Sequence, residues 1–398
     1  MSAVPVLGAA RALAVAADLA EQFEKEAAER DIERVVPAAE LDQLSDAGLL
    51  AVTVPAEHGG ADLSTETLTE VVRLLATGDP NIAQIPHSHF VYVNALRQQG
   101  TPAQRRRLFG EVLAGKRFGN AQSELGTKHV RDFRTTLRPR PASQGGGWVL
   151  DGEKGYCTGA LLAHWIPVLA HLGDDGPMHV AWVERHADGV SVRDDWDGLG
   201  QRTTASGTVT LDGVAVDEEL ITPWHLTFTG PQTYGAFAQV LHAAIDAGIA
   251  RAAVTEAARF VTTKSRPYPD AGVERHAEDP LVVQAFGEME LQTRAAEALT
   301  AEAARAIDRA DADLTDETAA QASLATAAAR AATARAAVEV SSRLFEVAGT
   351  RSALRSLALD RHWRNARVHS LHDPAAWKIQ HLGRWAVDGV RPPRHGQL

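Results

Sequence analysis

The alternation of apolar and polar positions divides the chain into three zones, and the first of them is helical. Apolar side chains recur with the period of an α-helix in three stretches, 9–30, 66–76 and 83–98. Ser64 or Thr65 can serve as the N-cap of the second stretch, because a side-chain oxygen at that position accepts a hydrogen bond from an amide of the first turn. We therefore expect an N-terminal helical domain over residues 1–117.

The central zone, residues 118–222, changes to short alternating runs. These runs lie at 135–139, 148–150, 166–171, 179–184 and 208–214. Turn signals such as Asp151-Gly152 and Asp212-Gly213 interrupt them. Short runs in which apolar and polar residues alternate, bounded by such turns, predict an antiparallel β domain.

The third zone, residues 223–398, returns to long alanine-rich stretches with one apolar stripe each. They run over 232–262, 281–309, 317–347 and 375–388. Asp373-Pro374 precedes the last one, and this pair is typical of a helix start with Asp as the N-cap and Pro at the first helical position. Long helices joined by short connections predict a helical bundle. The fold class expected is therefore α+β with several domains.

Composition narrows the possible functions. A chain of 398 residues exceeds the usual size of one core, and its net charge of −11 disfavours nucleic acid as a partner. The single cysteine, Cys157, excludes an intrachain disulfide and zinc-finger spacings. We find no apolar run of the length that a membrane span needs and no secretory signal, so we expect no membrane partner and a cytoplasmic protein.

Two pairs of histidines suggest proton-transfer chemistry. His369 and His372 are three residues apart, so they share a face if their segment is helical, and His87 and His89 precede another helical stretch. Imidazoles titrate near neutrality and can exchange protons with a reacting group. The pairs could also bind a metal, but no carboxylate stands in a metal-binding register with them, and we expect no metal site.

Three further segments are candidates for ligand contacts. Asn120 and Ser123 are small polar residues suited to a planar heterocycle, although the same residues suit an ordinary turn. Thr158 follows Cys157 in a Gly-Tyr-Cys-Thr-Gly-Ala run, where the hydroxyl could donate a hydrogen bond and the thiol is expected to be buried and inert. Arg266, at a helix end beside Pro267, could bind a phosphate or be solvated.

Taken together, these motifs resemble the acyl-CoA dehydrogenase superfamily over nearly the whole chain. Gln122-Ser123-Glu124-Leu125 stands where that family ends a strand in Thr-Glu-Pro, and Tyr156-Cys157-Thr158 stands for its Trp-x-Thr. Arg266 matches the arginine after its first bundle helix, and Arg364-Asn365 matches its late Arg-Asp. The resemblance implies a middle antiparallel β-barrel, a C-terminal four-helix bundle, and a flavin between them.

One departure from the family pattern points to a particular branch. The slot in which many acyl-CoA dehydrogenases carry a catalytic glutamate holds His372-Asp373-Pro374-Ala375. His-x-x-His-Asp-Pro at this place is similar to the flavin-dependent monooxygenase branch, which includes dibenzothiophene monooxygenase and the sulfur-acquisition oxidoreductases. In that branch, FMN reduced by a separate NAD(P)H:flavin reductase reacts with O2 to a C4a-hydroperoxyflavin. The substrate implied is a small apolar or organosulfur compound.

The resemblance also implies roles for individual residues. His372, His89 and Thr158 would hold and steer the proton, and His369 would support them. The flavin would rest on Asn120, Ser123, Thr158, Trp196 and Ser206. Arg266 and Arg364 would reach the FMN phosphate from a neighbouring subunit of a homotetramer.

Two other interpretations stay open at this point. Asp373 could act as the base of an FAD-dependent acyl-CoA dehydrogenase. Alternatively, the chain could be a non-catalytic scaffold that keeps the fold without its chemistry.

Overall fold

The N-terminal zone is helical, as expected. The computed structural model describes residues 3–141, 143 and 145–397. Its first helices are α1 (Ala9–Glu33), α2 (Ala38–Asp46), α3 (Thr65–Gly78), α4 (Pro80–Gln84), α5 (His87–Gln99) and α6 (Pro102–Leu113). Ser64 caps α3, where its side chain accepts from the Thr67 amide at 3.2 Å. The stretch expected at 83–98 is broken, because the chain leaves α4 at Ile85 and restarts at Pro86, which has no amide proton to donate.

The middle zone is one mixed sheet. Its strands are β1 (Thr136–Pro139), β2 (Trp148–Lys154), β3 (Trp165–Leu172), β4 (Met178–Glu184), β5 (Val190–Val192), β6 (Val209–Val216) and β7 (Ile221–Thr222). They lie in the order β5-β6-β2-β1-β3-β4-β7. All neighbouring pairs are antiparallel except β1 and β3, which pair in parallel with Thr136 opposite His171. The expectation of a purely antiparallel domain was therefore wrong for this one pair of parallel strands.

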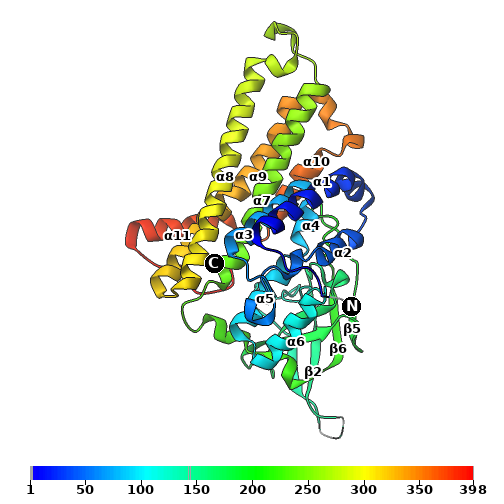
Figure 1. Ribbon diagram of the computed structural model, residues 1–398, viewed down its shortest axis with the longest axis vertical. Helices are drawn as coiled ribbons and strands as arrows, with labels where there is room; N and C mark the ends of the chain where they lie inside the picture. Colours follow the sequence, from blue (N-terminus) through cyan, green and yellow to red (C-terminus); the bar gives the residue numbers. More distant parts are fainter. Residues whose placement is uncertain (1–2, 142, 144, 398) are drawn as a thin grey trace.

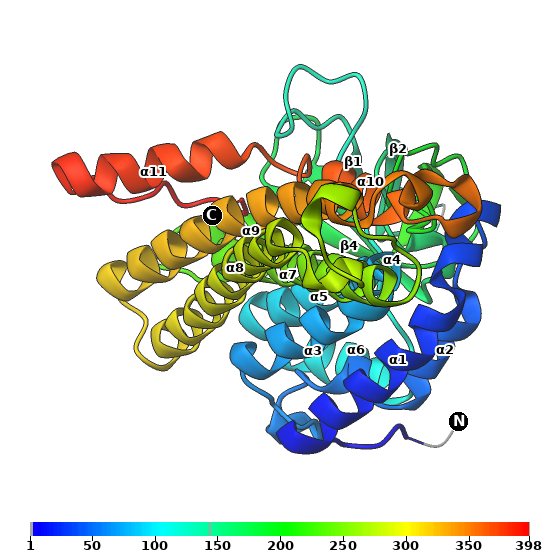
Figure 2. The ribbon, with the colours of Figure 1, turned by 90° about the horizontal axis from the view of Figure 1, so that it is seen from above.

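The C-terminal zone is built on three long helices. These are α7 (Tyr234–Thr263), α8 (Pro280–Ala312) and α9 (Asp316–Ala348), followed by the shorter α10 (Asp360–His369) and α11 (Ala375–Asp388). The long helices extend away from the sheet (Figure 1), and α11 stands apart from the body along α9 (Figure 2). Asp373 does not cap α11, contrary to expectation, because Pro374 holds that position and the carboxylate binds Arg330 and Lys378 instead.

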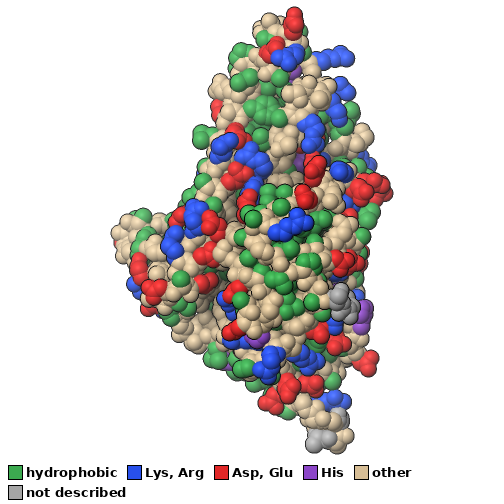
Figure 3. Space-filling model, viewed as in Figure 1, with side chains coloured by type: hydrophobic (Ala, Val, Ile, Leu, Met, Phe, Trp, Pro, Cys, Tyr) green, Lys and Arg blue, Asp and Glu red, His purple; other side chains and the backbone are tan. Residues whose placement is uncertain are grey.

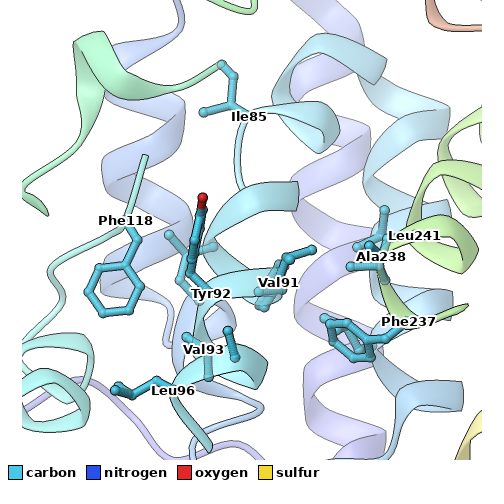
Figure 4. Close-up of a cluster of buried hydrophobic side chains, with 14 of the residues drawn as sticks. Ile85, Val91, Tyr92, Val93, Leu96, Phe118, Phe237, Ala238 and Leu241 are labelled. Carbon is cyan, nitrogen blue, oxygen red and sulfur yellow. The ribbon is translucent and has the colours of Figure 1, made fainter. Parts of the chain in front are cut away.

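One core joins the N-terminal helices, the sheet and the start of α7. Figure 4 shows part of it, where Val91 of α5 points toward Leu241 and Phe237 of α7 and Tyr92 lies on the side of Phe118. α7 is buried on almost every side in its first half, as expected of a helix inside the molecule rather than on its surface. This packing fixes α5 and α7 against each other and sets the position of the histidines they carry.

The outer surface carries charges of both signs, intermixed over the face drawn in Figure 3. No helix in the described part of the chain is long and apolar enough to cross a membrane.

Candidate functional site

Four histidines from separate elements form the first part of the site, which we call the histidine cluster: His87, His242, His369 and His372. They come from the start of α5, the middle of α7, the end of α10 and the turn after it. The His242 ring lies between two others, with its centroid 3.9 Å from that of His87 and 3.9 Å from that of His372. His87, His242 and His369 are buried, whereas the His372 side chain is 47% exposed. The cluster therefore has one face open to a ligand.

A hydrogen-bonded relay runs through this cluster. Asp246 on α7 accepts from Nδ1 of His369 at 2.6 Å, so that nitrogen carries a proton. Nε2 of His369 lies 3.0 Å from Nδ1 of His242 and 3.0 Å from the Gln84 side-chain oxygen. Nε2 of His242 is buried and has no hydrogen-bond partner. The geometry thus leads from a buried carboxylate through two imidazoles to a free ring nitrogen.

Three buried ion pairs, formed by two cations and two carboxylates, make the surroundings of the relay electrically balanced. Arg330 lies 2.5 Å from Asp246 and 3.2 Å from Asp373, and Lys378 lies 2.6 Å from Asp373. Two carboxylates and two cations cancel, so an extra proton on any of the histidines would leave an uncompensated buried charge. Burial alone would raise the pKa of Asp373, but His372, Arg330 and Lys378 hold it well below its usual range. Such a carboxylate is a poor proton acceptor.

The same physics keeps the buried histidines neutral. Burial lowers the pKa of His87 to about 3 and that of His242 well below its ordinary value. Burial also outweighs the Asp246 carboxylate at His369, so its pKa is lowered. At neutral pH these rings can therefore pass a proton on but do not store one.

Three hydroxyls form the second part of the site, the hydroxyl cluster: Thr158, Thr204 and Ser206. Oγ1 of Thr158 lies 2.8 Å from Oγ of Ser206, which lies 2.7 Å from Oγ1 of Thr204. Thr204 donates to the backbone carbonyl of Gln201 at 2.9 Å. Thr158 and Ser206, both predicted from the sequence, are therefore in direct contact.

Unusual backbone geometry surrounds the hydroxyl cluster. Tyr156, Gln201 and Ala205 have φ of 56°, 50° and 48°, in the left-handed region that residues with a side chain rarely adopt. Such conformations persist only where the surrounding structure enforces them, and they concentrate at functional sites. Cys157 lies in the same turn, and burial raises the pKa of its thiol to about 12, which fits the expected inert cysteine.

The segment 81–85 and helix α10 connect the two clusters. The Thr203 amide donates to the Asn81 side chain at 3.3 Å, and a Cβ on Gly159 would sit 3.1 Å from Ile85. The residue before Ile85, Gln84, contacts His369 as described above. From α10, the Asn365 side chain accepts from the Gln201 amide at 2.7 Å. The clusters therefore flank one seam between the sheet domain and the bundle.

Several other predicted flavin contacts lie beside the hydroxyl cluster. Asn120 donates to the Tyr156 carbonyl at 3.3 Å, and its own side-chain oxygen is buried without a partner. Trp196 donates to the Gln201 carbonyl at 2.7 Å and packs edge-on against Tyr156. The backbone carbonyl of Ser123 accepts from Gly155 at 2.9 Å.

Three predicted residues lie elsewhere or have their atoms engaged. Both ring nitrogens of His89 bind backbone groups, the Leu50 carbonyl at 2.7 Å and the Phe118 amide at 3.0 Å, so its geometry favours a structural role. Arg364 directs its guanidinium at Asp31 and Asp360, which leaves no free fork for a phosphate. Arg266 is exposed in the connection between α7 and α8, at the end of the bundle away from the sheet (Figure 1).

Sequence reasoning missed most of the relay. His242, Asp246 and Arg330 lie in alanine-rich helices and Gln84 lies at the end of α4, and the pattern of these segments predicted only packing. The available signal was a set of polar residues on helix faces otherwise expected to be buried, and His242 and Asp246 are four apart, hence on one face of α7.

Orphaned polar atoms test whether a flavin fits this seam. The side-chain amide of Gln201, the hydroxyl of Thr203, the oxygen of Asn120 and Nε2 of His242 are buried and lack a protein partner. A buried polar atom without a hydrogen bond costs folding free energy unless a ligand or a water molecule supplies the missing partner. A heterocycle with several donors and acceptors supplies complementary groups, so the residues present fit FMN. Within residues 3–141, 143 and 145–397, no group of three or more His, Cys, Asp or Glu side chains could hold a metal ion.

Comparison with known proteins agrees with this architecture. Family models of the acyl-CoA dehydrogenase N-terminal, middle and C-terminal domains match residues 11–116, 123–214 and 240–376. The dibenzothiophene monooxygenase of Rhodococcus qingshengii is 33% identical over 396 residues, covering 96% of this chain and 94% of that protein. SfnC of Pseudomonas putida, a probable FMNH2-dependent monooxygenase, is 34% identical and covers 96% of each chain. The FMN-bound crystal structure of TdsC from a Paenibacillus species superposes with a TM-score of 0.92 at 33% identity, covering 98% of this chain and 100% of TdsC.

Proposed function

Because the chain belongs to the acyl-CoA dehydrogenase superfamily, in its flavin-dependent monooxygenase branch, we propose that it is an FMNH2-dependent monooxygenase that oxygenates a small organosulfur compound. Two of the similar proteins support this choice: one is a dibenzothiophene monooxygenase and the other is a probable FMNH2-dependent monooxygenase. Reduced FMN, when bound, supplies the electrons with which O2 is activated.

The observation that carries the proposal is the absence of a usable base where a dehydrogenase needs one. Asp373 is buried between Arg330 and Lys378, which hold its pKa well below the usual range. It therefore cannot accept a substrate α-proton efficiently at neutral pH. The neighbouring His372 is half exposed and stacks on the relay. This arrangement favours oxygenation over acyl-CoA oxidation.

The chain's own residues would then hold a proton and exclude water. The half-exposed His372 ring packs against His242, and His242 and His369 behind it connect to Asp246 without any solvent-exposed step. We infer that this relay returns a proton to His372 after each turnover and that Thr158 orients the ring of the cofactor. A site that kept bulk water in this path would lose reactive oxygen species as peroxide.

Phosphate binding would require a second copy of the chain. Arg364 is neutralised by Asp31, and the connection that carries Arg266 lies at the far end of the bundle from the sheet. Exposed leucines on α8 and an exposed Trp377 on α11 are apolar surface that a homotetramer could cover. We therefore propose that Arg266 completes the site of a neighbouring subunit. Electrons would come from a separate NAD(P)H:flavin reductase.

One experiment distinguishes the two enzymatic candidates. The purified protein is incubated with dibenzothiophene, FMN, NADH and a flavin reductase, and the sulfoxide and sulfone are quantified by chromatography. We expect oxygenated product that depends on both reductase and FMN. Protein purified with tightly bound FAD that is bleached by acyl-CoA, and that gives no oxygenated product, would support the dehydrogenase instead. Failure to bind any flavin would support the scaffold.

A further inference from the structure

A further pair of histidines lies at the edge of the sheet, outside both clusters. His179 is near the start of β4, and His225 lies in the short 3-10 helix Trp224–Phe228, which follows β7. β4 and β7 pair through only two positions, and the chain then continues into Pro223, which has no amide proton to donate. The two imidazoles lie next to each other just beyond this point, with their ring centroids 5.0 Å apart.

Both imidazoles are held in the same tautomer. Nδ1 of His179 lies 2.9 Å from the Pro177 carbonyl oxygen, and Nδ1 of His225 lies 3.0 Å from the Met178 carbonyl oxygen. A carbonyl oxygen can only accept, so each Nδ1 carries the proton and each Nε2 presents a lone pair. Within the part of the chain that the structure describes, no protein donor reaches either Nε2. Histidines that bind metals share this arrangement, in which a backbone carbonyl engages the ring nitrogen that does not bind the ion.

The spacing of the two rings suits one shared metal ion. Imidazole nitrogens bind Zn²⁺ at about 2.0–2.1 Å, and for N–Zn–N angles from a right angle to the tetrahedral value the ring centroids then lie about 4.5–5.2 Å apart. The observed separation of 5.0 Å falls within this range. Both side chains are partly exposed, so an ion from solution can reach them. Burial lowers the pKa of His179 and the nearby His225 lowers it further, so His179 is neutral and able to bind a metal at about pH 7.

We propose that His179 and His225 together bind one divalent transition-metal ion of the kind that prefers imidazole, such as Zn²⁺, Cu²⁺ or Ni²⁺. Water fills the remaining coordination positions, which distinguishes this pair from the groups of three or more ligands that the described residues lack. The two histidines are far apart in the sequence, so no motif pointed to them. The site is independent of the proposed function, because neither histidine belongs to the histidine cluster or to the hydroxyl cluster.

A bound ion links two parts of the fold that few backbone hydrogen bonds join. The segment of His225 leads into α7, and its aromatic residues Trp224 and Phe228 pack edge-on against Tyr234 at the start of that helix. The ion therefore ties the edge of the sheet to the helix that carries His242. Because the two ligands come together only in the folded chain, binding of the ion stabilises the folded protein.

The test titrates ZnCl2 into the full-length protein by isothermal titration calorimetry, after dialysis against a chelator. We expect His179→Gln and His225→Gln each to weaken zinc binding by about tenfold or more, because each variant removes one of the two ligands. Glutamine keeps an N–H donor for the backbone carbonyl, so the local fold is retained. His186→Gln, at an exposed histidine of the same domain, is the matched control and should bind zinc as the wild type does.

Two further readouts identify the ligands. With Cu²⁺ as the probe, electron paramagnetic resonance should show two coordinated nitrogens in the wild type and one in each single variant. ZnCl2 should raise the unfolding temperature of the wild type but not that of the double variant His179→Gln/His225→Gln. Zinc affinity that is unchanged in both single variants, or a wild type that binds no zinc, would overturn the inference. Either result would leave the proposed function intact, since that function is tested by the oxygenated product.

Discussion

At the scale of single residues, the chemistry depends on which side chains are already engaged in hydrogen bonds within the protein. Nδ1 of His369 donates to Asp246, and Oγ1 of Thr158 is hydrogen-bonded to Oγ of Ser206. His372 differs from both because its ring is half exposed and its nearest carboxylate, Asp373, lies 3.8 Å away. It is therefore the histidine of the cluster best placed to exchange a proton with a ligand.

We predict that His372→Ala uncouples oxygen consumption from product formation. Removing a half-exposed side chain is expected to change stability by less than about 1 kcal/mol. Without the imidazole, the reaction should release peroxide in place of oxygenated product. The peroxide-to-product ratio, measured with reductase and NADH, is the readout. His186→Ala, at an exposed histidine of the middle zone, is the control, and normal coupling in His372→Ala would exclude this residue as the proton partner.

We predict a related but smaller effect for His242→Phe. Phenylalanine keeps an aromatic ring between His87 and His372 but removes the nitrogen that continues the relay from His369. Coupling should fall severalfold and should depend more steeply on buffer concentration, because a small buffer would replace the relay. His362→Phe is the control, at another buried histidine with an unpartnered Nε2. Wild-type coupling in His242→Phe would leave the relay without a role.

His89 allows a prediction about pH. Burial lowers its pKa to about 4, whereas the unfolded chain titrates near the ordinary value of about 6.5. Between these values the unfolded state binds a proton that the folded state does not, so stability is complete above about pH 6.5 and falls on acidification by about 1.4 kcal/mol per pH unit for this group. In His89→Gln, urea unfolding between pH 6.5 and 4 should show a slope shallower by one proton. An unchanged slope would contradict this assignment.

At the scale of elements, the site arises where helix ends meet. The break between α4 and α5 presents Gln84 and His87 to the cluster, and the end of α10 presents His369. The sequence pattern predicted the long helices because their apolar stripes are periodic. It did not predict the break at Pro86 or the contact of α10 with Gln201, because these depend on packing between segments far apart in the chain.

The same reasoning explains which site residues could be found in advance. Thr158 and Asn120 occupy short motifs with family counterparts, and Ser206 was a weaker choice from a nearby loop. In the structure Thr158 contacts Ser206, and Asn120 donates to the Tyr156 carbonyl. Arg364 matched a motif as well, yet its guanidinium pairs with Asp31, more than three hundred residues away. His242 and Asp246 had no motif at all. Motifs therefore located the hydroxyl cluster, whereas the relay required the packing of α7 against α10.

A buried ion pair anchors the segment that follows Asn120 and Ser123. Lys154 on β2 is fully buried, 2.7 Å from Glu124, which also accepts from the Thr135 amide at 3.0 Å. We predict that Lys154→Met costs about 3–5 kcal/mol of unfolding free energy, because it leaves a buried carboxylate without its cation. Adding Glu124→Gln should recover part of this loss. Urea unfolding of the single and double variants provides the test, and a fully additive double variant would contradict the coupling.

At the scale of the whole molecule, we propose that the seam between sheet and bundle is the functional centre and that assembly through the bundle surface completes it. Leu281, Val283 and Leu291 on α8 are largely exposed. Isolated apolar residues on a surface need no explanation, but Val283 and Leu291 are eight residues apart, which puts two large exposed apolar side chains on the same side of α8. The proposed tetramer would cover this face and bring the connection that carries Arg266 to a neighbouring site.

We predict that Leu291→Glu, at a side chain that is 70% exposed in the single chain, shifts the protein to smaller assemblies in sedimentation velocity experiments. The charge would be buried in the interface without a partner. FMN affinity should fall together with assembly in Leu291→Glu. Arg266→Ala should lower FMN affinity in the assembled protein, but it should have no further effect when combined with Leu291→Glu. Val35→Glu, at an exposed apolar residue after α1, is the control. A Leu291→Glu variant with unchanged size and affinity would exclude this interface.

We propose that the chain transfers one atom of O2 to an organosulfur compound with electrons from reduced FMN. The most direct measurement supplies 18O2 to the protein with dibenzothiophene, FMN, NADH and a flavin reductase, and reads the sulfoxide by mass spectrometry. We expect one 18O atom per sulfoxide and a loss of this product in His372→Ala with a matching rise in peroxide. Sulfoxide formed without 18O, or formed equally when protein is omitted, would contradict it.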